Sequence, residues 1–365
     1  MLHCNAGKIA GRWCIRDKRL RYAIAMTTNH EPDLDPDLDP DLDPDLDPDL
    51  DPFPAAQFIR EIGRGVKGAR SMSREDAGAL YGAMLYGRVS DLELGAILLA
   101  MRIKGESVDE IAGFMDAAEH SFAPLPSPPG PYAPVLIPSY NGARKLANLT
   151  PLLALLLARE GVPVLIHGVQ QDPGRVTTAE ILADMGIGPT GSTADMPDAF
   201  AKRKPCFMPI ETLAPRLAHQ LSLRRILGVR NSTHTLVKIL QPFEGPALRL
   251  VSYTHPEYLT MLTEYFRNAA PAARGDAFLM RGTEGETVAN ANRARQIDWF
   301  HAGTQTLLAE RDPPADELAP APEGRNAAAT ADWIQRALRG EQPVPAPIAA
   351  QVAHCLRVSA ALRAG

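Results

Sequence analysis

Short apolar runs alternate with helix-like segments after residue 134, and this rhythm limits the folds that are open to the chain. Four runs have the length of a buried strand: Val135–Pro138, Val162–His167, Ala247–Tyr253 and Asp276–Arg281. An apolar segment of helix length, Pro151–Glu160, separates the first two. Strands that alternate with crossover helices are typical of a parallel sheet covered by helices. We therefore predict an α/β domain with a mostly parallel sheet over residues 126–365.

The residues before this region carry a helical pattern instead. Ser73, Ser90 and Ser107 each stand three residues before a carboxylate, which is the signature of a capped helix start. Gly87 and Gly105 stand where such helices would end. The pattern predicts a small helical domain over 53–125 with about four short helices. The proline-rich stretch 121–134 then acts as a linker between the two domains.

Five tandem Pro-Asp-Leu-Asp units occupy residues 32–51. Proline at every fourth residue excludes a helix, and the aspartates repel one another, so we predict a disordered extension over 1–52. The repeat is either a solvated spacer or an acidic segment that competes with nucleic acid for a basic groove. The net charge of −5 arises from this extension, because residues 52–365 hold 32 basic and 31 acidic residues.

Cysteine usage and hydropathy indicate a cytoplasmic protein without a membrane partner. The four cysteines have no paired spacing, which argues against a disulfide framework or a zinc site and fits a reducing compartment. The most apolar run, Leu149–Ala158, is far shorter than the roughly 20 residues that a membrane span needs. We therefore expect this run to form a buried helix.

Segments in both regions resemble the anthranilate phosphoribosyltransferase family. Residues 73–77 and 87–113 are similar to the N-terminal helical domain of anthranilate and pyrimidine-nucleoside phosphoribosyltransferases, and the turn Arg102–Glu106 is its specific mark. Leu227–Arg230 resembles the family's hinge segment. The resemblance implies a small helical domain beside a larger α/β domain, with part of 220–245 returning to the helical domain. It also implies a homodimer formed through the helical domain.

The family's active-site motifs are altered in this chain. The phosphate loop, Gly-Thr-Gly-Gly-Asp in the family, falls on Pro138–Gly142, where one glycine remains. Glycines let backbone N–H groups approach a pyrophosphate, and here a proline and Tyr140 fill that space. The family's magnesium-binding Asp-Glu pair falls on Thr287 and Val288. The resemblance thus implies a scaffold with no assigned catalytic residue and no cofactor, because pyrophosphate-leaving chemistry needs the metal.

One branch of the family shares these altered motifs. The run Pro138–Leu152 and the segment Glu61–Gly65 resemble the YbiB branch, whose members keep the fold and the dimer and are described as nucleic-acid-binding proteins. The resemblance implies that this chain binds nucleic acid, in particular DNA, without sequence specificity. Such binding depends on basic residues gathered on one surface.

Basic residues supply the first candidate phosphate contacts. Arg60, Arg64 and Lys67 are spaced to share one face of the first predicted helix, as a solvated face or a phosphate-contacting stripe. Arg144 and Lys145 stand at a predicted helix N-terminus, where the helix dipole favours an anion. Their charges are balanced either by a bound anion or by salt bridges to nearby acids.

The remaining candidates belong to the predicted cleft. Tyr140 either stacks on a base or fills the vacated phosphate site. Arg175 stands where the family has a phosphate-binding lysine, and Arg224 matches an arginine that meets the family's aromatic substrate. The further candidates are Asn141, Gly142 and Asn148.

Two other functions stay open at this stage. The first is a pentosyltransferase that uses phosphoribosyl pyrophosphate and magnesium, with Asn148, Arg175 and Arg224 as donor and acceptor contacts. Glu284 or Glu286 would then replace the missing metal ligands from shifted positions. The second is a regulatory protein that senses a phosphorylated metabolite in the old active site.

Overall fold

The computed structural model describes residues 51–65, 67–311, 322 and 324–364. All of them belong to one unit, Leu46–Gly365. The predicted extension over 1–52, apart from its last two residues, lies outside the described residues, as does most of the loop expected at 312–325.

Four helices form the first folded region: α1 (Ala56–Ile62), α2 (Arg74–Leu85), α3 (Asp91–Lys104) and α4 (Val108–Glu119). Each of the last three begins directly after one of the predicted capping serines. Ser107 Oγ accepts a hydrogen bond from the backbone N–H of Glu110, and the Glu110 carboxylate accepts one from Ser107 N–H in return. The three predicted helix starts are therefore confirmed.

Glu110 fastens the bundle internally. Its carboxylate is fully buried and accepts hydrogen bonds from Met72 N–H at 3.0 Å and from Lys104 Nζ at 2.7 Å. Tyr81 of α2 stacks on Phe114 of α4, with ring centroids 4.9 Å apart. A buried charge is tolerated where it is paired and hydrogen-bonded, and Glu110 meets that condition.

The second region is built on a seven-stranded sheet in the order β3-β2-β1-β4-β5-β6-β7. The first five strands in that order pair in parallel, and β6 and β7 pair antiparallel at one edge. The predicted α/β class with a mostly parallel sheet is confirmed. The strands are β1 (Val135–Ser139), β2 (Val164–Gly168), β3 (Cys206–Pro209), β4 (Leu248–Tyr253), β5 (Ala277–Arg281), β6 (Ile297–His301) and β7 (Thr304–Ala309).

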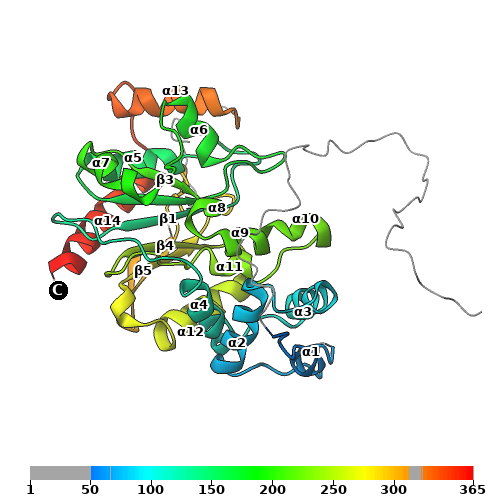
Figure 1. Ribbon diagram of the computed structural model, residues 1–365. Helices are drawn as coiled ribbons and strands as arrows, with labels where there is room; N and C mark the ends of the chain where they lie inside the picture. The colour runs from blue at the N-terminus through cyan, green and yellow to red at the C-terminus, as the bar shows by residue number, and fades with distance from the viewer. Residues whose placement is uncertain (1–50, 66, 312–321, 323, 365) are drawn as a thin grey trace, which may run out of the picture. The chain divides into compact units, whose positions relative to one another are not determined.

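Alternate residues of the strands enter two separate cores, one on each face of the sheet. Ile137 and Ile166 pack with α5 (Thr150–Arg159), α6 (Thr178–Asp184), α13 (Ala327–Leu338) and α14 (Ala346–Ala364). Leu136 and Leu165 face the other core, which includes α12 (Pro256–Asn268) and the helical bundle (Figure 1). The apolar run predicted as a buried helix is α5, and no helix among the described residues is long and apolar enough to cross a membrane.

A segment between β3 and β4 returns to the helical bundle. It contains α9 (Pro215–Ser222), α10 (Arg224–Leu227) and α11 (Thr233–Leu236). Gln220 Nε2 donates to the carbonyl of Met84 at 3.2 Å, and the hydroxyls of Thr233 and Tyr81 lie 2.8 Å apart. The described residues also form the shorter helices α7 (Met196–Ala201) and α8 (Ile210–Leu213) and the 3-10 helices Thr193–Asp195 and Ala272–Arg274.

Candidate functional site

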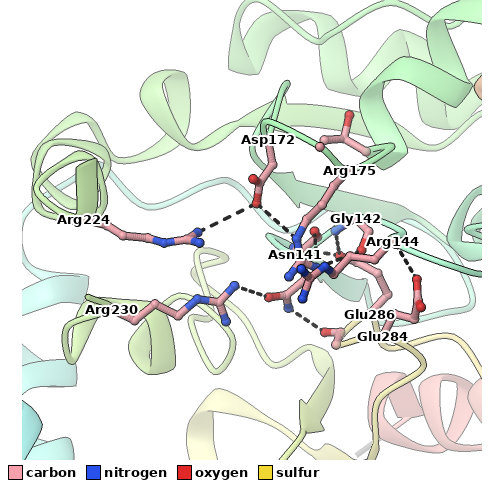
Figure 2. Close-up of polar contacts among 12 residues, drawn as sticks. Asn141, Gly142, Arg144, Asp172, Arg175, Arg224, Arg230, Glu284 and Glu286 are labelled. Atoms are coloured by element: carbon pink, nitrogen blue, oxygen red, sulfur yellow. Dashed lines mark hydrogen bonds and ion pairs between the residues drawn. The ribbon is translucent and has the colours of Figure 1, made fainter. Parts of the chain in front are cut away.

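The candidate site lies at the carboxyl ends of the parallel strands, where α/β sheets usually place their ligands. The loop after β1 carries Tyr140 to Asn148, the loop after β2 carries Asp172 and Arg175, and the loop after β5 carries Glu284 and Glu286. The segment from α9 to α11 adds Arg224 and Arg230 from the side of the helical bundle. Figure 2 shows these two arginines pointing toward Asp172 and Asn141.

Tyr140 fills the space of the altered phosphate loop. Its ring is buried, its hydroxyl lies 2.8 Å from His167 Nδ1, and the two rings meet edge to face. Burial raises the pKa of Tyr140 above its ordinary value and lowers the pKa of His167 to about 3, so both groups are neutral. Stacking of Tyr140 on a base is contradicted, because the ring is enclosed by the protein.

Two glutamates of the loop after β5 accept hydrogen bonds from backbone N–H groups of the phosphate loop and of the residues that follow it. Glu286 Oε1 accepts hydrogen bonds from Asn141 N–H at 2.8 Å and from Gly142 N–H at 2.7 Å. The Glu284 carboxylate accepts from the backbone N–H of Arg144 (Figure 2) and from that of Lys145 at 3.0 Å. We call Glu284 and Glu286 the carboxylate plug, since they take the place that phosphate oxygens would need.

A tight hairpin presents the carboxylate plug. Thr283 and Glu286 exchange two backbone hydrogen bonds of 3.0 Å, and the residues between them, Glu284 and Gly285, have φ values of 54° and 97°. Two consecutive positive φ values are typical of a type I′ turn, where Asn-Gly is the preferred pair. Glutamate is a strained choice at the first position. Its hydrogen bonds to the amides of residues 144 and 145 offset that strain.

The missing metal ligands are not replaced by these glutamates. The carboxylate plug already accepts hydrogen bonds from backbone N–H groups, and Thr287 and Val288 are buried beside it. No group of three or more His, Cys, Asp or Glu side chains within the described part of the chain is arranged to hold a metal ion. Glu286 Oε2 is buried without a hydrogen-bond partner, but one free oxygen is too few for the oxygen-rich shell of magnesium. The residues present do not fit the metal.

Several predicted contact residues turn inward. Arg175 Nη1 donates to the carbonyls of Asn141 at 2.9 Å and Gly142 at 3.3 Å, and its side chain is 16% exposed. Asn148 is buried and bonds to Thr178 Oγ1 and Thr150 N–H. Because the side chains of Arg175 and Asn148 find their hydrogen-bond partners inside the protein, they hold the loops in place and do not face solvent.

The backbone position of Arg144 and Lys145 differs from the predicted helix N-terminus. They lie in a bend five or more residues before α5, not at its N-terminus. The anion at their backbone N–H groups is the carboxylate of Glu284. Both side chains are exposed, and within the described ranges no carboxylate pairs with either. Their charges therefore point to solvent at the rim of the site.

The predicted basic stripe on the first helix is wrong, because α1 ends at Ile62. Arg64 and Lys67 lie beyond the helix, and Arg64 forms an ion pair with Glu61 and donates to the carbonyl of Arg60. Arg60 lies in α1, and Arg64 and Lys67 follow that helix in the chain. Their contact with phosphate stays a prediction.

Sequence reasoning missed three charged residues of the site. Asp172 lies 3.8 Å from Arg175 and 3.9 Å from Arg224, and Arg230 donates to Asn141 Oδ1 at 2.8 Å. Burial lowers the pKa of Lys238 to about 8. Arg230 is the last residue of the hinge segment Leu227–Arg230, so the resemblance of that segment to the family could have identified it. Asp172 and Lys238 carry no local pattern that marks them.

A pocket of about 280 Å³ adjoins these residues. It lies between the turn from α3 to α4, the α11 segment and the end of β4. Its lining includes Arg102, Arg230, Lys238, Tyr253 and Tyr258. Burial, together with Arg224 and Arg175, lowers the pKa of Arg230 from its ordinary value. The lining also includes Glu106 and Glu257, so the pocket carries charges of both signs.

Comparison with known proteins places the chain among phosphoribosyltransferase-like proteins. Residues 56–121 match the helical bundle domain of a glycosyl transferase family. Anthranilate phosphoribosyltransferase of Thermus thermophilus has a similar structure, with a TM-score of 0.64 and 21% identity over 85% of this chain and 92% of that one. The enzyme of Saccharomyces cerevisiae in complex with PRPP and Mg gives a TM-score of 0.62 at 13% identity, over 85% and 89% of the two chains. These two likenesses show the fold.

Relatives in sequence show the family. Anthranilate phosphoribosyltransferase of Pectobacterium atrosepticum is 29% identical over 202 residues, which are 54% of this chain and 55% of that protein. The uncharacterized protein YbiB of Escherichia coli K12 is 45% identical over 302 residues, which are 82% of this chain and 92% of YbiB. The chain therefore belongs to the anthranilate phosphoribosyltransferase-like glycosyl transferase family, in the group of YbiB.

Proposed function

We propose that this protein binds nucleic acid, and DNA in particular, through its phosphates and with little sequence specificity. The observation that carries the proposal is the carboxylate plug next to outward-facing cations. The backbone cradle that holds a pyrophosphate in a transferase is filled by Glu284 and Glu286. Arg144 and Lys145 extend from the same loop into solvent, where a polymer backbone has access to them.

The cations of the rim come from two parts of the fold. Arg144 and Lys145 belong to the loop after β1, and Arg224 belongs to α10, with 41% of its side chain exposed. Arg230 and Lys238 lie deeper, in the adjoining pocket. A phosphodiester chain that crosses from the loop after β1 to α10 would contact Arg144 and Lys145 at one end and Arg224 at the other. Contacts of this kind supply affinity and register without reading bases.

The transferase alternative has less support. The reaction needs a bound pyrophosphate and magnesium to neutralise the charge on the leaving group. In this chain the backbone donors are used by the carboxylate plug, and Thr287 and Val288 stand where the family has metal ligands. A metabolite sensor in the same cradle meets the same obstacle, because the cradle already holds a carboxylate.

We also propose a homodimer through the helical domain. Leu92, Leu99 and Ile103 on α3 are 85%, 49% and 55% exposed, and their spacing puts them along one side of the helix. Ile226 of α10 is a further exposed apolar side chain, at 81%. Exposed large apolar side chains that recur on one helix are typical of a surface that pairs with another protein.

Fluorescence anisotropy with a labelled single-stranded DNA oligonucleotide tests the proposed binding. The wild-type protein is compared at low salt with the double variant Arg144→Ala, Lys145→Ala. The matched control is Lys202→Ala, Lys204→Ala, which removes the same charge from an exposed loop before β3, at the amino ends of the strands. We expect binding by wild type and control, and an affinity roughly tenfold lower for the rim variant, as for loss of a charge-assisted contact. Absence of wild-type binding would contradict the proposal, as would equal losses in both variants.

A further inference from the structure

Three arginines meet at the edge of the sheet beyond the candidate site. Arg281 ends β5, Arg295 precedes β6 by two residues, and Arg311 follows β7 by two residues. The strand register brings them together, because Met280 pairs with Ile297 and Ile297 pairs with Ala309. Three neighbouring strands therefore place one arginine each at the same end of the sheet. We call Arg281, Arg295 and Arg311 the arginine cluster.

The charges of the arginine cluster are close enough to repel. Burial lowers the pKa of Arg295 from its ordinary value, and Arg281, Arg293 and Arg311 lower it further. Arg281 and Arg311 are exposed, and Arg295 is half-buried. Among the residues that the structure describes, no carboxylate forms an ion pair with any of the three. Three like charges held at the ends of neighbouring strands favour a bound anion.

Tyr253 joins the arginine cluster to the pocket of the candidate site. It ends β4 and is the register partner of Arg281 on the adjacent parallel strand. The same residue lines the pocket that contains Arg102, Arg230 and Lys238. Burial and the charge of Asp298 raise the pKa of Tyr253, and all three arginines of the cluster oppose that rise. The cations thus continue from the pocket along the sheet edge.

We propose that the arginine cluster is a second phosphate-contacting site, which binds the phosphodiester backbone of the nucleic acid beyond the cleft. This inference rests on the proposed function and extends it to residues outside the cleft. Guanidinium groups bind phosphate through two parallel hydrogen bonds, and three of them at the ends of adjacent strands suit successive phosphates of one strand. The contacts are with the backbone, so they carry no base specificity.

The test measures the salt dependence of binding to a labelled single-stranded DNA oligonucleotide. The full chain is compared with the triple variant Arg281→Gln, Arg295→Gln, Arg311→Gln. The matched control changes the same three residues to Lys, which keeps the charge and the length of the side chains. A thermal melt of each protein shows whether the fold is retained. Glutamine at half-buried position 295 keeps two of the three methylene groups of the arginine side chain.

We expect the Gln variant to bind roughly tenfold more weakly at moderate salt, with a slope of log K against log salt that is shallower by about 2, the value for three lost phosphate contacts on a single strand. The Lys control keeps a slope close to that of wild type. The weakening is equal for oligonucleotides of different sequence. If wild type binds and the Gln variant matches it in affinity and slope, the arginine cluster makes no contact and the proposed function stands. If wild type itself does not bind, the proposed function fails and this inference fails with it.

Discussion

Glu286 shows how one side chain converts a phosphate cradle into an internal contact. One of its carboxylate oxygens accepts two backbone N–H groups from a loop more than 140 residues earlier in the sequence. In the sequence, Glu284 and Glu286 are acids near the position of the family's metal site. A glutamate can either bind a metal or accept hydrogen bonds from backbone N–H groups, and its residue type does not distinguish these two roles. Only the fold brings the hairpin onto the loop, so the carboxylate plug was not predictable from the sequence.

Removing the Glu286 carboxylate tests its structural role. Glu286→Ala leaves the N–H groups of Asn141 and Gly142 without their acceptor, at a cost of about 1–3 kcal/mol in the free energy of unfolding. Glu286→Gln is the matched control, because its amide oxygen still accepts and the loss is smaller. Urea denaturation measures both. Equal stability of the Ala variant and wild type would show that the carboxylate plug contributes nothing.

The same variant tests whether the cradle retains affinity for phosphate. With the carboxylate gone, inorganic phosphate is expected to bind the freed N–H groups and to raise the melting temperature of Glu286→Ala. Wild type, in which Glu286 occupies those groups, is expected to respond less. A rise of the same size in both proteins would place the phosphate elsewhere and contradict the comparison of the carboxylate with phosphate oxygens.

His167 makes stability depend on pH. Burial lowers its pKa from 6.5 to about 3, so between these values the unfolded chain binds a proton that the native chain does not. The free energy of unfolding therefore decreases as the pH falls from 6.5 toward 3, by up to about 1.4 kcal/mol per pH unit for this group. Urea denaturation at several pH values compares wild type with His167→Gln. The variant should show the shallower dependence, and parallel curves would refute the assignment.

At the scale of elements, capping patterns and apolar runs predicted much of the fold. The serines at 73, 90 and 107 predicted the starts of α2, α3 and α4, since a cap is a local signal. Strands β3, β6 and β7 were missed. β3 has only four residues, so its apolar run is too short to be told from a buried helix segment, and β7 is an edge strand whose exposed or half-buried side chains form no continuous apolar run.

Helix α3 carries the proposed dimer surface, and a charge on it tests that proposal. Leu99→Glu places a carboxylate within the apolar stripe and should yield a monomer. Leu307→Glu on β7 is the matched control, since Leu307 is 50% exposed and Leu99 is 49% exposed. Light scattering after size exclusion should give twice the chain mass of 39.5 kDa for wild type and control. A monomeric wild type would contradict the homodimer, and dissociation of the control would contradict the role of α3.

At the scale of the whole molecule, the segment from α9 to α11 connects the helical bundle to the candidate site and contributes two of its arginines. It packs on the helical bundle through Gln220 and Thr233 and directs Arg224 and Arg230 toward the strand ends. The resemblance to the family implied that such a segment returns to the helical domain. It did not reveal Asp172, Lys238 or the arginine cluster, because their proximity depends on the register of strands and loops far apart in the sequence.

The acidic repeat supplies a prediction for the full chain. Residues 31–51 carry 11 acidic and no basic residues, and tethering gives such a segment a high effective concentration near any basic surface of the same chain. A variant with Asn for the repeat's aspartates is expected to bind DNA more tightly than wild type at low salt. The difference should vanish at high salt, where screening removes the competition. Identical dissociation constants of the variant and wild type at low salt would contradict this competition and would indicate that the repeat acts as a spacer.

The most direct test of the central claim is the affinity of the wild-type protein for one labelled oligonucleotide over a series of salt concentrations. Contacts from Arg144, Lys145 and Arg224 alone predict a slope of log K against log salt of about −2 for a single strand, and a steeper slope with each further phosphate contact. Oligonucleotides of unrelated sequence should give the same line. A protein that does not bind at low salt, or that binds with an affinity independent of salt, would contradict the account.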